Sequence, residues 1–219
     1  LSTSDYGELS GLTECMLDYC EPRHISLSLP SLRADSFSAE LMERVQKTRK
    51  SGLTFACEAG TQRLRDVINK NIREEDVLHA CEIAFQGGWN NVKLYFMMGL
   101  PTETYEDLDG ISDICKKVAY CWRENTPNRA RGVRITASAS CFVPKPQTPF
   151  QWDAQDTLEQ FREKQAHLKV VMKTKNVTYN WHDAETSVLE GVIARGDRRQ
   201  GKAILLAWQR GCKMDGWDQ

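Results

Sequence analysis

Apolar and polar residues alternate in short runs that are separated by longer helical patterns. HISLSLPSLR, residues 24–33, begins with an apolar residue at every second position, which predicts a strand that Pro30 ends. Short apolar runs at residues 53–57, 91–97 and 133–143 predict three more strands. Amphipathic helical patterns are found before, between and after these strands, at about residues 9–19, 36–50, 74–86, 103–122, 158–173, 185–194 and 202–210.

Strands begin about every 30 to 40 residues between positions 20 and 150, with a helical pattern in each interval. Repeated βα units of this kind predict an α/β fold with a parallel sheet. Four strands cannot close a barrel of eight, so a partial (βα) barrel and an open doubly wound sheet both remain. The composition changes after Phe150. We therefore expect the βα units in residues 1–150 and a small, mainly helical extension in 151–219, which includes a strand-like VTYNW.

The stretch KLYFMMGLPTETYEDL, residues 93–108, has the pattern of a strand, a tight turn and a helix. In a parallel sheet such a junction lies at the carboxyl edge, where ligands bind. Gly99 lacks a Cβ, so a ligand could approach the backbone closely there, although a plain turn would use glycine equally well. We expect this stretch to form part of any site that the chain has.

Composition and charge are those of a soluble globular protein, with 41% hydrophobic and 27% charged residues among 219. The net charge of −1 gives no overall positive field that would indicate nucleic acid. No apolar run approaches the roughly 20 residues that span a membrane. No signal peptide opens the chain, so we expect a cytoplasmic protein. Because no Met opens it either, we also expect a piece of a longer protein.

Eight cysteines are present, and none forms a CxxC motif or has zinc-ligand spacing with histidine. Cys81 and Cys115 fall on apolar helical faces, and Cys57 and Cys141 fall in predicted strands. Since cysteine is among the most buried residue types, we expect core thiols and no metal site. A reducing cytoplasm agrees with this interpretation.

Glu58 stands where a predicted strand stops and a glycine turn begins. A carboxylate there could accept hydrogen bonds from the vicinal hydroxyls of a ribose. It could equally well complement backbone N–H groups near Thr61, where the next helix begins. Lys70, predicted at the end of that helix, could hold a carboxylate or phosphate. A simple cation at a helix C-terminus is the interpretation that the sequence alone favours.

Two further polar pairs are candidates. Arg33, with Ser31 close by, ends the first predicted strand and could grip a carboxylate in bidentate fashion, or form an ordinary salt bridge. His182 and Asp183 could transfer a proton, but an aspartate that caps the following helix is the favoured interpretation. By themselves, these residues indicate an α/β protein with a ligand-binding edge and nothing more specific.

Five stretches together resemble the radical S-adenosylmethionine (SAM) superfamily: SLSLPSLRADSF, FACEAGTQRLRDVINKN, NNVKLYFMMGLPTETYEDL, ASASCFVPKPQTPFQW and NWHDAETSVLEGVIARGDRR. Within it they are similar to a bacterial group that has an N-terminal cobalamin-binding-like region and is associated with a DUF2344 protein. The resemblance implies a six-stranded partial (βα) barrel, with the four predicted strands as its third to sixth. It also implies a bound S-adenosylmethionine, and cobalamin in the intact protein.

By this resemblance, Glu58 lies near the ribose and Lys70 near the methionyl carboxylate, although relatives have Gln and Arg at these positions. Ser31 and Arg33 would lie on the same edge. The segments expected beside the adenine consist of Met97, Met98, Gly99, Leu100 and Pro101, and of Phe142, Val143 and Pro144.

The superfamily's CxxxCxxC loop, which holds a [4Fe–4S] cluster, is absent from the chain. We therefore expect the cluster only in the intact protein, where it would cleave S-adenosylmethionine to a radical that abstracts hydrogen, and we expect this segment alone to be inactive. Alternatives are a methyl- or methylthiotransferase acting on RNA or protein, and a degenerate, non-catalytic binding module. A (βα) hydrolase or aldolase ranks last because no nucleophile or metal set supports it.

Overall fold

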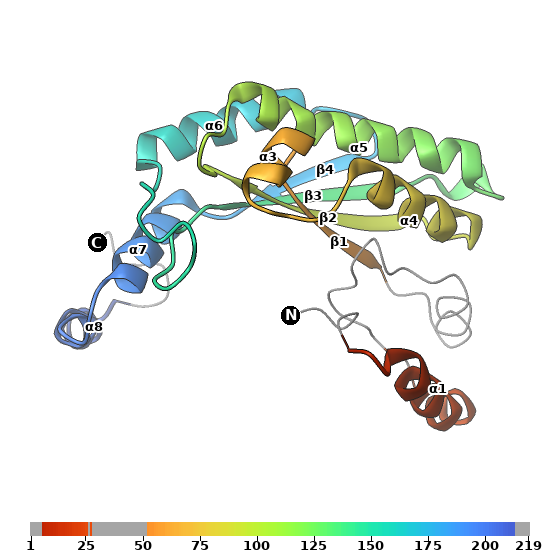
Figure 1. Ribbon diagram of the computed structural model, residues 1–219, viewed down its shortest axis with the longest axis horizontal. Coiled ribbons are helices and arrows are strands. Elements are labelled where there is room, and N and C mark those ends of the chain that lie inside the picture. Colours follow the sequence, from red (N-terminus) through yellow and green to blue (C-terminus); the bar gives the residue numbers. More distant parts are fainter. Residues whose placement is uncertain (1–5, 26, 28–51, 213–219) are drawn as a thin grey trace.

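The computed structural model describes residues 6–25, 27 and 52–212. Four parallel strands form one sheet in the order β1-β2-β3-β4 (Figure 1). Since all four strands run the same way, their carboxyl ends lie at one edge. The predicted α/β fold with a parallel sheet is confirmed. The strands are β1 (Leu53–Glu58), β2 (Asn91–Met98), β3 (Arg134–Cys141) and β4 (Val177–Trp181).

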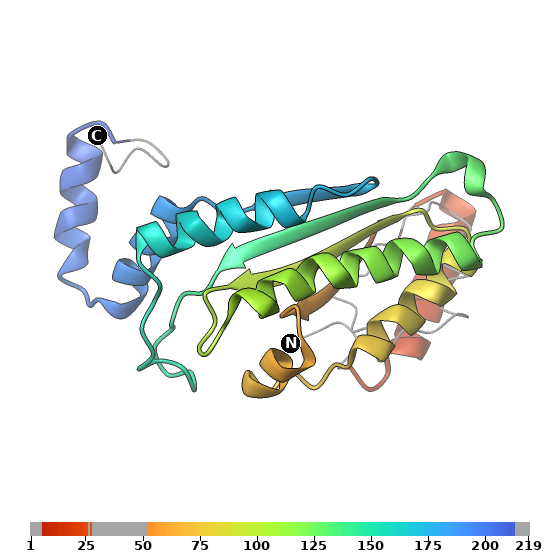
Figure 2. The same cartoon turned by 90° about the horizontal axis from the view of Figure 1, so that it is seen from above.

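Helices α3 to α6 lie on one face of this sheet, and α7 and α8 lie beyond its carboxyl edge (Figures 1 and 2). Helix α4 packs against α5, α5 against α6, and α6 against α7. The helices are α1 (Leu9–Cys20), α3 (Gln62–Val67), α4 (Glu74–Gln86), α5 (Tyr105–Asn125), α6 (Leu158–Val171), α7 (Ala184–Arg195) and α8 (Gln200–Gln209), with the short 3₁₀ turns η2 (Glu21–Arg23) and η4 (Arg129–Arg131).

The predicted strands at 53–57, 91–97 and 133–143 are confirmed to within two residues at each end. Most of the strand predicted at 24–33, and the whole helical stretch predicted at 36–50, lie outside the described residues. VTYNW is a strand, as predicted. Its place in the fold was not predicted, since it pairs in parallel with β3 as the fourth strand of the sheet. The sheet thus continues beyond residue 150, and a domain division there stays a prediction.

The helix-covered face of the sheet holds the main core. On β2, Val92, Leu94, Phe96 and Met98 alternate with less buried neighbours and are almost fully buried. The apolar stripe of α5 packs onto this face, and α6 adds Phe161 and Leu168 to the same apolar cluster. Burying a side chain of this size contributes about 1.5–3 kcal/mol. The buried α5 residues of this cluster are Leu108, Ile111, Ile114, Cys115, Val118 and Trp122.

The opposite face of the sheet carries mostly polar side chains, and those in the middle of β3 are small. The side chains that alternate with the core residues of β2 are Lys93, Tyr95 and Met97, and Tyr95 is 41% exposed. Strand β3 contributes Ser138 and Ser140 on the same side, by its register with β2. Strands buried on both faces of a parallel sheet are normally apolar throughout. Among the described residues, this side of the sheet is therefore not lined as a second apolar core, although Ser138 on it is only 8% exposed.

Two glycines let α5 approach the loop after β1. A Cβ at Gly60 would lie 2.1 Å from the carbonyl oxygen of Asp107, and one at Gly110 would lie 2.6 Å from the carbonyl oxygen of Gly60. Both distances are far shorter than real contacts, and the obstacles are backbone atoms that cannot rotate away. The pair therefore fixes the position of this loop at the carboxyl edge.

Replacing Gly60 with alanine is expected to lower the free energy of unfolding by about 1–3 kcal/mol, because α5 must move away from the added methyl group. Urea denaturation followed by circular dichroism measures this change. Gly201→Ala is the matched control, since nothing lies within 4 Å of a Cβ at this exposed helical position. An unchanged midpoint for Gly60→Ala would contradict the close packing of loop and helix.

Candidate cofactor-binding edge

Glu58 ends β1 in an unusual backbone conformation. The pairing of β1 with β2 shifts register between Ala56 and Glu58, as at a β-bulge, and Glu58 has a φ of 64°. A left-handed conformation is uncommon for a residue other than glycine and costs roughly 1–2 kcal/mol. Bulges and strained residues gather next to active sites, where they redirect a side chain. The geometry therefore singles out Glu58 among the residues of this strand.

The Lys70 ammonium lies 3.0 Å from Oε1 of Glu58. Both side chains are partly exposed, at 29% and 23%, so a ligand can reach the pair. Helix α3 ends at Val67, so Lys70 follows the helix instead of ending it as predicted, and Asn69 before it has a φ of 53°. The backbone N–H of Lys70 donates to the carbonyl of Arg65, which holds the segment against α3.

The loop between β1 and α3 is held from within by a buried guanidinium. The Arg65 side chain is almost fully buried and donates to the carbonyl oxygen of Ala59 at 2.8 Å. Its other nitrogens donate to Oε1 of Gln62 at 3.2 and 3.3 Å. These charge-assisted hydrogen bonds fix the residue that follows Glu58. Sequence reasoning missed Arg65, because nothing in its spacing indicates burial.

The predicted tight turn after β2 is present, with a φ of 80° at Gly99. A Cβ on Gly99 would meet Phe161 at 2.7 Å and Asp156 at 2.8 Å. The Gly99 N–H donates to Oε1 of Glu103 at 2.8 Å. Only glycine suits this position, on both conformational and steric grounds.

Glu103 belongs to a buried charge network that the sequence did not indicate. Its carboxylate is 1% exposed and lies 2.8 Å from the ammonium of Lys164, which also lies 2.7 Å from Asp156. Burial raises the pKa of Glu103, and the hydrogen bond from Lys164 offsets only part of this rise. Burial alone would lower the pKa of Lys164, but two carboxylates raise it above its ordinary value. The network ties α6 to the turn at Gly99.

Asp107 links the loops that follow β1 and β2. Its buried carboxylate accepts hydrogen bonds from the hydroxyl of Thr61, the guanidinium of Arg63 and the backbone N–H of Thr104. Burial alone would raise the pKa of Asp107, but these donors outweigh it and hold the pKa below its ordinary value. Asp107 also forms a capping box with Thr104 at the start of α5.

The predicted adenine-side segments meet in a small apolar cluster at this edge. Leu100 and Phe142 pack with Ala59 and Leu64, and Met97 packs against the group. The N–H of Phe142 donates to the carbonyl of Met98 at 2.8 Å, so β3 stays paired with β2 up to this point. Met98 itself points into the main core. Of the other predicted residues, Val143 and Pro101 are half-buried and Pro144 is buried.

Of the remaining candidates, His182 and Asp183 are not among the residues of this cluster. Ser31 and Arg33 lie outside the described residues. Asp183 is the N-cap of α7 and accepts the N–H of Thr186 at 2.8 Å, which lowers its pKa. That is the capping role favoured from the sequence. The backbone N–H of His182 donates to the carbonyl of Ala139 at 3.1 Å, which extends the pairing of β4 with β3.

Residues 5–115 match the Radical SAM superfamily. The chain belongs to this superfamily, and the one-sided parallel sheet agrees with a partial (βα) barrel. An uncharacterized protein from Methanocaldococcus jannaschii is 33% identical over 189 residues, which are 86% of this chain and 39% of that protein. The chain thus spans about two fifths of the length of this relative.

The donor set for an iron–sulfur cluster does not fit the part of the chain that the structure describes. No group of three His, Cys, Asp or Glu side chains there is placed to hold a metal ion. Cys57, Cys81 and Cys115 are core thiols, as predicted, and burial raises the pKa of Cys57 and Cys115 to about 12. All three side chains are at most 1% exposed in the main core, so iron cannot reach their sulfur atoms in the folded chain. Among the described helices, none is long and apolar enough to cross a membrane.

Replacing Lys164 with methionine is expected to lower the free energy of unfolding by roughly 3–5 kcal/mol at pH 7, because the carboxylate of Glu103 then stays buried without a cation. Chemical denaturation measures the loss. Lys116→Met is the control, since Lys116 forms an exposed pair with Asp113 on α5 and should change stability by less than about 0.5 kcal/mol.

The loss of stability in the same variant should change with pH in one direction. The pKa of Glu103 in the folded protein lies above the ordinary value of 4.5. Folding therefore becomes less favourable as the pH rises through the interval between the ordinary pKa and the raised one. Without Lys164 the folded pKa rises further and the interval widens. The deficit of the variant relative to the original protein should therefore grow between pH 4.5 and 7. A deficit that shrinks over this range would contradict the buried ion pair.

Proposed function

We propose that this chain contributes the S-adenosylmethionine-binding edge and the substrate-side face of a radical SAM enzyme. The observation that carries the proposal is the Glu58–Lys70 pair, 3.0 Å apart at the end of β1. Glu58 would accept hydrogen bonds from the ribose hydroxyls, and Lys70 would bind the methionyl carboxylate. The small apolar cluster around Leu100 and Phe142 would receive the adenine.

Three features of the structure support this assignment. The strained φ of Glu58 directs a carboxylate at the carboxyl edge, where parallel sheets bind ligands. Gly99 lets Phe161 and Asp156 pack closely against the turn after β2, which fixes the position of this turn at the edge. The polar face formed by Tyr95, Ser138 and Ser140 leads away from this edge and offers hydroxyl groups to a substrate.

S-adenosylmethionine supplies, when bound at a reduced cluster, a carbon radical that abstracts a hydrogen atom. The residues of this chain would bind and orient the nucleoside and exclude water, which are the protein's contributions to such chemistry. The charge networks of Asp107 and Glu103 would keep both loops in place while the ligand binds. No residue described here is assigned a proton-transfer role.

S-adenosylmethionine binding to the 219-residue chain should depend on both members of the pair. Glu58→Ala and Lys70→Met should each weaken binding roughly 10- to 100-fold, because each removes a hydrogen bond to a charged group, worth about 1.5–3 kcal/mol. Isothermal titration calorimetry measures this change. Glu58→Gln, which introduces the residue found in relatives, keeps an acceptor for the ribose hydroxyls and should retain most of the affinity.

Lys117→Gln is the matched control, since Lys117 pairs with Glu74 between two outer helices, away from the edge. It should leave the affinity unchanged. Equal losses in the control and in Lys70→Met would reject the proposed site.

The chain should bind no stoichiometric [4Fe–4S] cluster, because it lacks the CxxxCxxC motif and its core thiols are buried away from solvent. Anaerobic reconstitution followed by iron and sulfide analysis tests this. One cluster per chain would overturn the expectation and would mean that other cysteines act as ligands.

The finer expectations from the resemblance stay predictions. They are a cobalamin-binding-like region and a DUF2344 partner for the intact protein, and a cytoplasmic location. Methyl or methylthio transfer and a non-catalytic binding module stay as alternatives. A CxxxCxxC motif encoded upstream of residue 1 would favour the enzyme over the module.

A further inference from the structure

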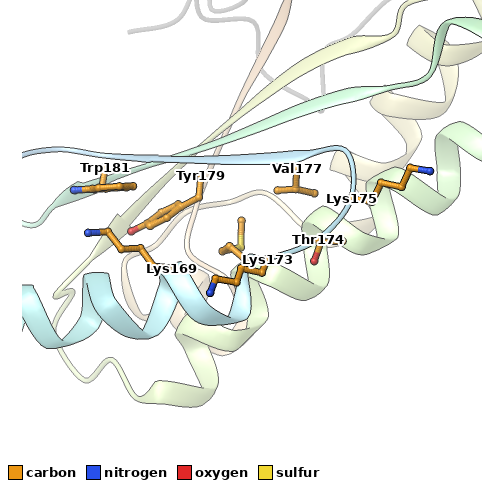
Figure 3. A pocket seen from close by; sticks show the side chains of 8 residues that line it. Lys169, Lys173, Thr174, Lys175, Val177, Tyr179 and Trp181 are labelled. Carbon is orange, nitrogen blue, oxygen red and sulfur yellow. The ribbon is translucent and has the colours of Figure 1, made fainter.

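An open groove of about 470 Å³ lies between β4 and the end of α6 (Figure 3). β4 is the last strand in the order of the sheet, so the groove follows an edge strand. By register with the buried residues of β3, the groove side chains of β4 are on the helix-covered side of the sheet, away from the polar face. Its lining consists of Lys169, Met172, Lys173, Thr174, Lys175, Val177, Tyr179 and Trp181.

The groove is positively charged without compensation. Residues 164–182 contain four lysines, two histidines and no Asp or Glu. Lys164 is neutralised by Glu103 and Asp156. Within the described chain, no ion pair joins Lys169, Lys173 or Lys175 to a carboxylate. Although the net charge of the whole chain is −1, this local concentration of like charge favours an anionic ligand.

Two aromatic rings lie beside these lysines. The ring centroids of Tyr179 and Trp181 are 5.2 Å apart with planes tilted by 30°, and the ammonium of Lys169 lies 4.0 Å from the Trp181 centroid. Trp181 is 41% exposed. Figure 3 shows Tyr179 and Trp181 projecting from β4 toward the same groove as Lys169 and Lys173. Lysines alone would suit any polyanion, whereas an exposed indole next to them suits a base that stacks.

The arrangement is elongated. Val177 and Trp181 are four residues apart along β4, which corresponds to about 13 Å at 3.3 Å per residue. Lys173 and Lys175 precede the strand, while Trp181 ends it near the carboxyl edge. A polymer with several phosphates can contact both ends at once, and a single phosphate group cannot. The groove therefore favours a strand of nucleic acid over a mononucleotide.

We propose that this groove binds single-stranded RNA, with the lysines on phosphates and a base stacked on Trp181. The hydroxyl of Thr174, between Lys173 and Lys175 in the chain, can donate to and accept from a ribose 2′-hydroxyl. The inference goes beyond the proposed function, because it concerns another face of the sheet. Its test uses no S-adenosylmethionine, so the two proposals can fail separately.

Fluorescence anisotropy with a labelled oligouridine and the 219-residue chain tests the proposal. The double variant Lys173→Gln/Lys175→Gln should bind about tenfold more weakly. It should also lower the slope of log K against log salt by about 1.4, because each lost contact to a single strand accounts for about 0.7. Trp181→Leu should weaken binding about tenfold, whereas Trp181→Phe, which keeps an aromatic ring, should retain most of the affinity.

Arg198→Gln/Lys202→Gln removes the same charge at two exposed positions outside the groove and should bind like the original chain. Thermal melting of each variant shows whether it is folded. Three results would overturn the proposal: no binding of oligouridine, equal losses in both double variants, or equal competition by polyglutamate, which would indicate an acidic peptide. Equally tight binding of oligodeoxyuridine would overturn the assignment to RNA.

Discussion

In the described part of the chain, helices bury one face of a parallel sheet, and this burial is the constraint on which the other features depend. On β2, residues such as Leu94 and Phe96 must face the helices, so the residues between them must face the other way. A shift of register by one residue would place Tyr95 and Lys93 in the core. The pattern that stabilises the fold therefore also creates a polar face, and the loops at the carboxyl edge stand above it.

Electrostatic interactions hold that edge in place. Asp107 joins the first two βα loops through Thr61 and Arg63, and Lys164 joins α6 to the turn at Gly99 through Glu103. Charges buried this deeply contribute little net stability when paired but cost several kcal/mol when left alone. Their effect is therefore to favour one arrangement of the loops. Glu58 is different, because its partner Lys70 is accessible and its conformation is strained.

The sequence predicted the elements well and the charge networks poorly. Periodicity located α4 at its observed bounds, because a stripe such as Val77, Cys81 and Phe85 has only one way to be buried. VTYNW was recognised as a strand but not as a member of the sheet, since pairing with β3 is a contact between distant residues. The ion pair of Lys164 with Glu103 was missed for the same reason. The two residues are far apart in sequence, and no local pattern joins them. The resemblance placed the segments of Leu100 and Phe142 on the same side of the ligand, and the two residues share an apolar cluster.

The central claim is that S-adenosylmethionine binds at the carboxyl edge beside β2. Met97 and Met98 test it directly, because Met97 packs at the edge cluster whereas Met98 points into the core. Methyl NMR spectra of the chain, labelled at methionine and assigned with a Met97→Leu variant, would be recorded during titration with S-adenosylmethionine. The account predicts that the Met97 resonance shifts while those of Met98 and of Met172, at the far groove, stay in place. A shift confined to Met172, or no shift at Met97 at saturation, would contradict it.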